Sequence, residues 1–490
     1  MKRLTDIRLT FTSFLICTVF AITALFSLIQ AAHAELPENI SIALKNSGLG
    51  SDQVSIFIQP LSASPALLAT PLIEYRADVS LNPASNMKLL TSYAALALLG
   101  PAYRWKTEAY IDGKLINGVL YGDLYFKGYG DPDFSQADFW QLIHQLRRQG
   151  LKEIKGDIVI DQSYFASQSP DAGQFDGEAL RAYNATPAAF IVQGKTSSFR
   201  FDADATEIKV QAEPYLKELS VINLLKPNQQ ACNAWRNDLR YEVSNSAAKD
   251  GGSAAIIFNG SFPANCGEKY LELMALSEND YHLYLFRNLW GEAGGIFAGK
   301  LRIKDIPGTA FKFSEHVSES LSQTLPEINK WSNNLMAKQL LLTIAAEKND
   351  LPATEAKAAI AIKTWLDSIG LHFNELVIDN GSGLSRLERI SARHLGTLLL
   401  HAYYSPVMPE LMASLPILGI DGTMQKRMNN SVALAHGHLK TGSINNVYSV
   451  AGYMLGQSGQ RYVVVFMVND EKAGFTRATQ DELLEWTYLH

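Results

Sequence analysis

The spacing of apolar and polar positions changes twice along the chain, which divides it into three stretches. In the first stretch, residues 36–45 have the pattern of a short amphipathic helix, and apolar residues crowd residues 53–61 as they do in a strand. Apolar residues then recur at helical spacing through residues 83–99, and Gly100 with Pro101 ends that pattern. We therefore expect a helix, a strand and a buried helix in this order.

The second stretch, residues 101–308, mainly shows the period-two alternation of strands. Residues 105–134 predict β-hairpins because glycine and aspartate separate the alternating segments, and residues 138–150 predict an amphipathic helix. Further strands are expected at residues 156–165 and over most of residues 194–280.

Helical spacing returns in the third stretch, residues 309–490, and is followed by three strands in succession. Short loops between these strands favour an antiparallel meander. We therefore predict an α+β fold. A mixed α+β domain of residues 35–100 and 309–490, with an antiparallel sheet flanked by helices, is split by a β-rich insertion of residues 101–308. The expected helices are 331–347, 355–370, 390–404 and the C-terminal residues, and the expected strands are 436–444, 447–455 and 461–470.

Residues 1–34 have the pattern of a signal peptide. Three basic residues stand within the first eight, an apolar stretch follows, and Ala32 and Ala34 are the small residues that a signal peptidase requires. We expect cleavage after Ala34 and a periplasmic protein. An uncleaved membrane anchor is the alternative, because the apolar stretch is long for a signal peptide.

Charge and cysteine content limit the partners and cofactors that the protein can have. The formal net charge of −6 at pH 7 argues against nucleic acid as a partner. Loss of Cys17 with the signal peptide leaves Cys232 and Cys266, which in an exported chain form one disulfide or remain as two buried thiols. Their spacing fits no zinc site, and we expect neither a metal nor an organic cofactor.

Three short motifs stand in ordered context: two of them start predicted helices, and the third lies on a predicted strand that a hairpin follows. They are SNMK at residues 85–88, SNN at residues 332–334 and KTG at residues 440–442, which together match the Ser-x-x-Lys, Ser-x-Asn and Lys-Thr-Gly elements of acyl-serine enzymes. Each motif alone is weak, and a second Ser-x-x-Lys occurs at Ser246 and Lys249, in a polar, glycine-rich segment. The order and structural context of the three indicate a catalytic site.

The first motif supplies a nucleophile and its base. A serine hydroxyl needs a base to take its proton, and Lys88 can do so only as a neutral amine. Burial against the apolar helix and the nearby charge of Lys440 would both lower the pKa of Lys88. The backbone N–H groups of Ser85 and Ser443 are the expected oxyanion hole.

The other two motifs supply groups for the leaving amine and the substrate. Ser332 is expected to relay a proton to the leaving amine, and Asn334 to bind the substrate amide. Lys440 and Thr441 are expected to hold a terminal carboxylate. Gly442 would let the strand approach the substrate closely.

These features resemble the low-molecular-mass penicillin-binding proteins of the D-alanyl-D-alanine carboxypeptidase/endopeptidase type, the penicillin-binding protein 4 type. The resemblance runs over essentially the whole mature chain, and its phrases here are GDLYFKGYGDPDF, IKGDIVIDQSYFAS, ATPAAFIVQGKTSSF, DNGSGLSRLERIS and HLKTGSINNVYSVAGYM. It implies a transpeptidase/β-lactamase-like domain that is split by a β-rich insertion of two nested domains. It also implies a hydrolase that cuts peptidoglycan stem peptides through an acyl-enzyme on Ser85 and binds β-lactams covalently. Asn333, where aspartate is commoner, and residues 444–446 depart from the wider pattern.

The resemblance also implies a pocket for the diamino-acid side chain of the wall peptide. Asp161 would pair with its ammonium, Phe165 would cover its methylenes, Arg386 would bind its carboxylate, and Asn445 would add a hydrogen bond. The alternative is that the insertion serves stability or presents a partner surface.

Two other functions share these motifs. A catalytically weak penicillin-binding or wall-binding protein could keep the fold, and a β-lactamase carries the same three elements. The β-lactamase is disfavoured because class A enzymes carry a Glu-x-x-Leu-Asn string, which this chain lacks, and have no insertion of comparable length. A homo-oligomer also remains possible.

Overall fold

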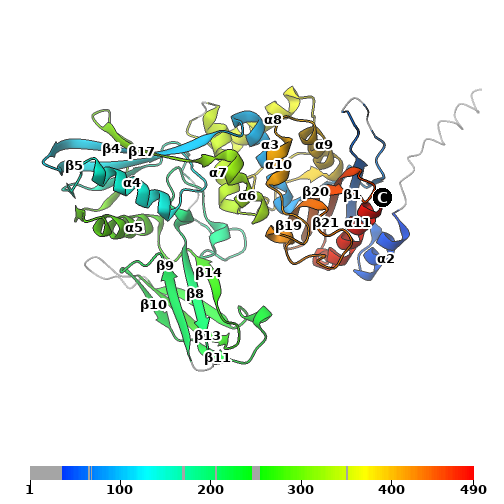
Figure 1. Ribbon diagram of the computed structural model, residues 1–490, viewed down its shortest axis with the longest axis horizontal. Helices are drawn as coiled ribbons and strands as arrows, with labels where there is room; N and C mark the ends of the chain where they lie inside the picture. The colour runs from blue at the N-terminus through cyan, green and yellow to red at the C-terminus, as the bar shows by residue number, and fades with distance from the viewer. Residues whose placement is uncertain are drawn as a thin grey trace, which may run out of the picture.

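The computed structural model describes residues 36–64, 67, 69–167, 171–204, 207–244, 254–348 and 351–490. These residues form a helix-and-sheet domain, a second sheet domain beside it, and a small β domain below the second (Figure 1). The expected signal peptide lies outside the described residues. Within them, no helix combines the length and the apolar character that a membrane crossing needs.

The first domain is built on an antiparallel sheet that joins both ends of the chain. The strand order is β19–β20–β21–β1–β2, and Ile56 of β1 lies opposite Phe466 of β21. The last three strands in sequence form the expected meander. The strand bounds are β1 (Val54–Pro60), β2 (Ile73–Tyr75), β19 (Gly437–Ile444), β20 (Val447–Leu455) and β21 (Arg461–Asn469).

Helices cover both faces of this sheet, which explains why β1 is apolar at nearly every position. Ile56 and Ile58 pack with α2 (Glu38–Asn46) and α11 (Arg477–Leu489), while Phe57 points into the larger core on the other face. That core contains α3 (Met87–Leu99), α6 (Leu321–Lys330), α7 (Asn334–Glu347), α8 (Glu355–Ser368), α9 (Ala392–Tyr403) and α10 (Met408–Ala413). Helix α3 is buried throughout from Met87 to Leu96, as its continuous apolar pattern predicts.

The second domain is an inserted seven-stranded sheet with two helices. The long hairpin of β4 and β5 forms its centre, and β17 pairs with the free edge of β4. The insertion therefore returns to the first domain at Ser320 rather than at residue 308 as expected. The bounds are β4 (Arg104–Ile116), β5 (Val119–Gly128), β6 (Glu153–Ile154), β7 (Ile158–Asp161), β15 (Ile296–Phe297), β16 (Leu301–Ile303), β17 (Phe311–Ser320), α4 (Gln136–Arg148) and α5 (Glu278–Glu292).

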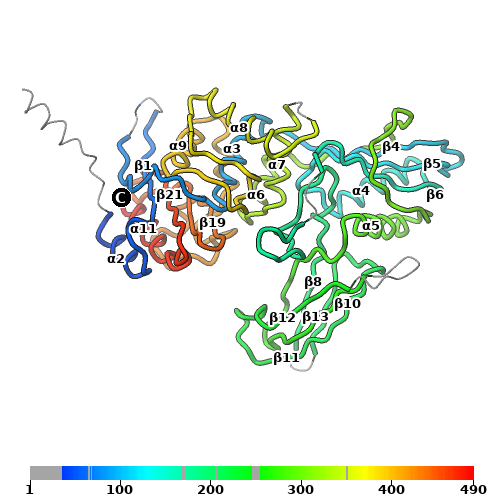
Figure 2. Tube along the Cα trace, turned by 180° about the vertical axis from the view of Figure 1, so that it is seen from behind, coloured from blue at the N-terminus to red at the C-terminus, as the bar shows by residue number. Residues whose placement is uncertain are grey.

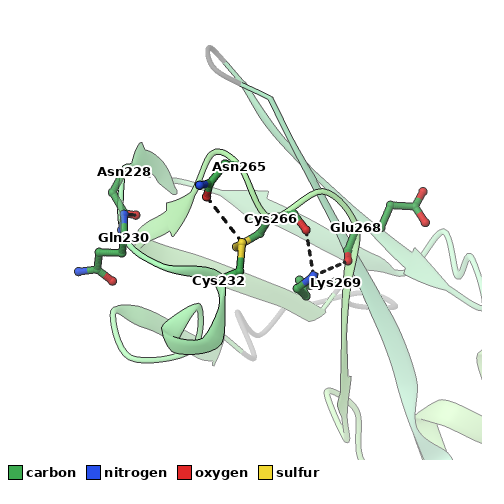
Figure 3. Close-up of a disulfide and its surroundings, with 7 residues drawn as sticks. All are labelled: Asn228, Gln230, Cys232, Asn265, Cys266, Glu268 and Lys269. Atoms are coloured by element: carbon green, nitrogen blue, oxygen red, sulfur yellow. Dashed lines mark hydrogen bonds between the residues drawn. A yellow bond between two sulfur atoms is a disulfide. The ribbon is translucent and has the colours of Figure 1, made fainter. Parts of the chain in front are cut away.

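The third domain is nested within the second and consists of two small sheets. Phe201 and Phe258 meet between them, 5.1 Å apart at their ring centroids. Cys232 and Cys266 form the disulfide expected from the cysteine count, and it joins two loops of this domain (Figure 3). The bounds are β8 (Ser197–Ala203), β9 (Ile208–Glu213), β10 (Leu219–Asn223), β11 (Lys226–Asn228), β12 (Leu239–Ser244), β13 (Ala254–Pro263) and β14 (Lys269–Leu273).

The α+β class is confirmed, and three details differ from the sequence-based expectation. Helices α5 and α6 were not predicted, because α5 follows a strand-rich stretch and α6 carries Pro326 inside it. The helix expected from residue 331 begins at Asn334, because Asn333 accepts a hydrogen bond from the Met336 N–H and caps it.

Candidate active site

Ser85 stands in a tight turn at the start of the buried helix α3. A 3-10 turn over Ala84–Asn86 leads into the helix, and Ala84 has a left-handed φ of 46°. Asn82 fixes this turn because its side-chain oxygen accepts a hydrogen bond from the Ala84 N–H at 2.8 Å, and its amide donates to the Ser385 carbonyl. The turn presents Ser85, partly exposed, at the N-terminal end of a helix, where the helix dipole is positive.

Lys88 lies one helical turn later and its side chain is completely buried. Its Nζ is 3.2 Å from Ser85 Oγ, 2.7 Å from Asn334 Oδ1 and 2.5 Å from the Ser382 carbonyl oxygen. Burial, and then the charge of Lys440, hold the pKa of Lys88 well below its usual value. A neutral amine in contact with a serine hydroxyl can act as a general base.

The second and third motifs meet each other beside the first. Ser332 lies between α6 and α7 with a left-handed φ of 60°, and Lys440 Nζ donates to its Oγ at 2.9 Å. Lys440 is fully buried, and burial lowers its pKa to about 7. Thr441 Oγ1 donates to Thr423 Oγ1 at 2.8 Å. The three motifs, far apart in sequence, therefore form one cluster.

Strand β19 passes close to the turn that carries the nucleophile. A Cβ atom placed on Gly442 would lie 2.7 Å from the Pro83 carbonyl oxygen and 3.0 Å from the Ser85 nitrogen. This close approach requires glycine. Ser443 is the next residue on this edge strand and is exposed.

Glu388 is a buried acid beneath Lys88 that the sequence did not single out. Its Oε1 accepts hydrogen bonds from the N–H groups of Asn380 at 3.2 Å and Gly381 at 2.7 Å. These bonds hold the turn whose Ser382 carbonyl contacts Lys88. Burial raises the pKa of Glu388 to about 7, and its Oε2 has no hydrogen-bond partner among the described residues.

The structure brings together only half of the expected side-chain pocket. Arg386 donates from Nη1 to the Asn445 carbonyl oxygen at 2.8 Å, and its guanidinium lies 4.6 Å from the centre of the Phe175 ring. Arg386 and Asn445 are both exposed, so this part of the pocket is accessible.

Asp161 and Phe165 lie elsewhere. The Asp161 carboxylate is buried at the end of β7, where it accepts hydrogen bonds from Lys127 Nζ at 3.2 Å and Ser163 Oγ at 2.6 Å. Phe165 is buried and stacks on Tyr164. Among the described residues, neither side chain has a hydrogen bond or ion pair with the catalytic cluster, so their part in the substrate pocket stays a prediction.

Residues 171–187 lie beside the catalytic cluster, where Asp161 and Phe165 were expected. Asn334 Nδ2 donates to the Tyr183 carbonyl at 3.4 Å, and Lys338 Nζ donates to the Ala185 carbonyl at 3.3 Å. A cavity of about 400 Å³ between this segment and Arg386 is also lined by Asp379. The segment has no hydrophobic period, and its aromatic residues among charges were the only signal of a role. The second Ser-x-x-Lys, at Ser246, lies outside the described residues.

A partly exposed serine beside a buried lysine, joined to a second serine–lysine pair and an asparagine on a split α+β domain, is the arrangement of penicillin-binding serine enzymes. The family profile described as the D-Ala-D-Ala carboxypeptidase 3 (S13) family matches residues 36–488. The chain belongs to this family and is a serine-type D-Ala-D-Ala carboxypeptidase, a hydrolase.

Individual relatives agree with this assignment. The chain is 24% identical to the D-alanyl-D-alanine carboxypeptidase DacB of Haemophilus influenzae, over 97% of this chain and 95% of that protein. It is 28% identical to the D-alanyl-D-alanine carboxypeptidase of Actinomadura sp. strain R39, over 80% of this chain and 74% of that one. The crystal structure of penicillin binding protein 4 from Haemophilus influenzae has the same fold, with a TM-score of 0.73 and 22% identity over 91% of this chain and 100% of that one.

Proposed function

We propose that this protein hydrolyses the D-Ala-D-Ala bond of peptidoglycan stem peptides through an acyl-enzyme on Ser85. The observation that carries the proposal is the 3.2 Å contact between Lys88 Nζ and Ser85 Oγ, made by a lysine without exposed surface. Lys88 takes the hydroxyl proton as Ser85 Oγ attacks the carbonyl carbon of the penultimate D-alanine. The backbone N–H groups of Ser85 and Ser443 stabilise the oxyanion that forms.

The Lys440–Ser332 pair handles the leaving group. As the peptide C–N bond breaks, Ser332 passes its proton to the amine of the departing D-alanine and recovers one from Lys440 or Lys88. Lys440 and Thr441 hold the terminal carboxylate, and Asn334 binds the amide of the acyl residue. Water then attacks the ester, and Ser85 regains its hydroxyl proton from the base.

The wider substrate range follows from the same chemistry. A β-lactam places a strained amide where the scissile bond would lie, so Ser85 opens it and keeps the acyl group. A relative from Haemophilus influenzae has been crystallised in complex with a β-lactam, which supports this part of the proposal.

Cross-linked peptides, cut by an endopeptidase reaction, are the second substrate class. Arg386, with the Asn445 backbone, is the proposed ligand for a side-chain carboxylate.

We place the reaction in the periplasm, after removal of residues 1–34. The Cys232–Cys266 disulfide suits an oxidising compartment outside the cytoplasm.

The experiment is the release of D-alanine from diacetyl-L-Lys-D-Ala-D-Ala by the native protein and by Ser85→Ala. We expect turnover by the native protein and none above background by the variant, with equal melting temperatures for the two. Turnover by Ser85→Ala would disprove the nucleophile. A native protein that is labelled by penicillin but never releases D-alanine would instead be a silent binding protein.

A further inference from the structure

A second groove lies between residues 171–187 and the nested β domain. Its volume is about 570 Å³. Leu239 and Leu271 form its apolar floor, and the remaining lining is polar: Glu178, Arg181, Tyr183, Arg236, Arg240 and Tyr241.

The wall of this groove is tied both to the nested domain and to the catalytic cluster. The Met274 N–H donates to the Leu180 carbonyl at 2.8 Å, and Arg181 forms an isolated antiparallel bridge with Leu273. Two residues further on, the Tyr183 carbonyl accepts the hydrogen bond from Asn334 of the second motif. A molecule in the groove therefore lies against the same short segment that borders the active site.

The three arginines of this groove form no salt bridge among the described residues, although Asp176 is close enough for the charge of Arg181 to act on its carboxylate. The Arg181 guanidinium lies 5.4 Å from the Tyr183 ring centre, and Arg240 donates only to backbone carbonyls of its own turn. Burial, and then the charge of Arg181, lower the pKa of Arg236, so two of the guanidiniums are close enough to repel each other. Arg236 and Arg240 are exposed and form no salt bridge among the described residues, and such positive charge on a chain of net charge −6 favours an anionic ligand.

We propose that this groove binds a carboxylate-bearing arm of the peptide substrate, at a distance from the scissile bond. The proposal rests on the proposed function for the identity of the substrate as a peptide. Guanidinium groups bind carboxylates through paired hydrogen bonds, and tyrosine rings cover the apolar part of a peptide chain. Because Glu178 lines the same groove, a peptide with isolated carboxylates fits it better than a continuous polyanion.

The test compares two D-Ala-D-Ala pentapeptides that differ only in a glutamate or a glutamine residue upstream. The variant is the double substitution Arg236→Ala/Arg240→Ala, since both side chains are exposed and neither belongs to the catalytic cluster. Arg200→Ala is the matched control, because Arg200 is an exposed arginine of the same domain that pairs with Glu268.

We expect the double variant to lose about tenfold in kcat/KM on the glutamate peptide, the equivalent of one or two charge-assisted hydrogen bonds. Its kcat/KM on the glutamine peptide and its rate of acylation by penicillin should match those of the native protein and of Arg200→Ala. Equal values for native and double variant on the glutamate peptide, or an equal loss on both peptides, would overturn the proposal.

Binding of the two fluorescently labelled peptides to native and double-variant protein separates this proposal from the proposed function. If the native protein releases no D-alanine, the proposed function fails, while a tenfold weaker affinity of the double variant for the glutamate peptide alone would still support the groove. Equal affinities would contradict the groove even where turnover is intact.

Discussion

The catalytic cluster and the groove lined by Arg236 and Arg240, here called the arginine groove, both contain basic side chains. Those of the catalytic cluster are buried, whereas these two arginines are exposed. Lys88 and Lys440 are fully buried, and every recorded contact of their amines is with an oxygen of a neutral group. Arg236 and Arg240 are exposed. Burial can make a lysine neutral and therefore basic, whereas a guanidinium keeps its charge. The comparison separates a region built for proton transfer from one suited to recognition.

Removal of the Lys88 amine should have the largest effect. Lys88→Met keeps the length of the side chain but cannot take the Ser85 proton, so we expect the rate of penicillin acylation to fall by about 10³ or more. Stopped-flow quenching of protein fluorescence measures that rate.

The matched control is Lys338→Met, on the next turn of α7 after Asn334. Lys338 is also largely buried, but its recorded hydrogen bond is to the Ala185 carbonyl. A Lys88→Met rate within tenfold of the native rate, or an equal loss in both variants, would contradict the role of Lys88 as base.

A methyl group on Gly442 should have the next largest effect. It would press on Pro83 and Ser85 at contact distances of 3.0 Å or less, so Gly442→Ala must displace the nucleophile turn or the strand. We expect acylation to slow by about 10²-fold, the usual result of misplacing reacting groups by about 1 Å.

Gly308→Ala is the control for this experiment, because nothing lies within 4 Å of a Cβ atom placed there. Its acylation rate should equal that of the native protein. Native-like acylation by Gly442→Ala would show that the close approach of β19 is not needed.

Removal of the Glu388 charge should shift the pH dependence more than the maximum rate. The negative charge of Glu388 raises the pKa of Lys88, against the larger lowering effects of burial and Lys440. Glu388→Gln therefore lowers the pKa of Lys88, and the amine loses its proton at lower pH. We expect the acid limb of the acylation profile to move to lower pH.

The glutamine oxygen should still accept the hydrogen bonds from Asn380 and Gly381, so the melting temperature should change little. Asp379 and Lys338 are the other charged groups that act on Glu388 or Lys88, and both remain in this variant. An unchanged acid limb, or one moved to higher pH, would contradict the electrostatic role of Glu388.

Asp161→Asn should have the smallest effect on activity and a measurable effect on stability. Burial raises the pKa of Asp161, but hydrogen bonds from Ser163 and Ile306 and the charge of Lys127 outweigh it and leave the pKa lowered. A lowered pKa in the folded state stabilises the protein above the unfolded-state pKa, and this stabilisation is lost as the pH falls through the folded-state pKa.

We expect Asp161→Asn to cost about 1–3 kcal/mol at neutral pH and less in acid, as read by thermal or urea unfolding. The ratio of kcat/KM values for peptides with and without a diamino-acid side chain should not change. A fall in that ratio would show that Asp161 helps to bind the diamino-acid side chain of the substrate.

These residues also show what the sequence can and cannot predict. The three catalytic motifs are local strings at the starts of strongly periodic elements, so both their chemistry and their neighbourhood could be inferred. Glu388 could not, because its importance depends on burial beneath a helix from another part of the chain.

The surroundings of Asp161 could not be predicted for a similar reason. Its partner Lys127 lies opposite it across the β5–β7 pairing, in a register that no local pattern fixes. Residues 171–187 have no period at all, and only the packing of three domains places them beside the active site.

The most direct test of the central claim is to map the site of penicillin attachment by mass spectrometry. Opening of the β-lactam joins its carbonyl carbon to a serine oxygen and breaks the ring C–N bond, so the whole mass of the drug is added. Trypsin should release residues 77–88, which contain both Ser80 and Ser85. We predict that fragment ions place the added mass on Ser85 and that Ser85→Ala acquires none. An adduct on Ser80, on any other residue, or on Ser85→Ala would contradict the account.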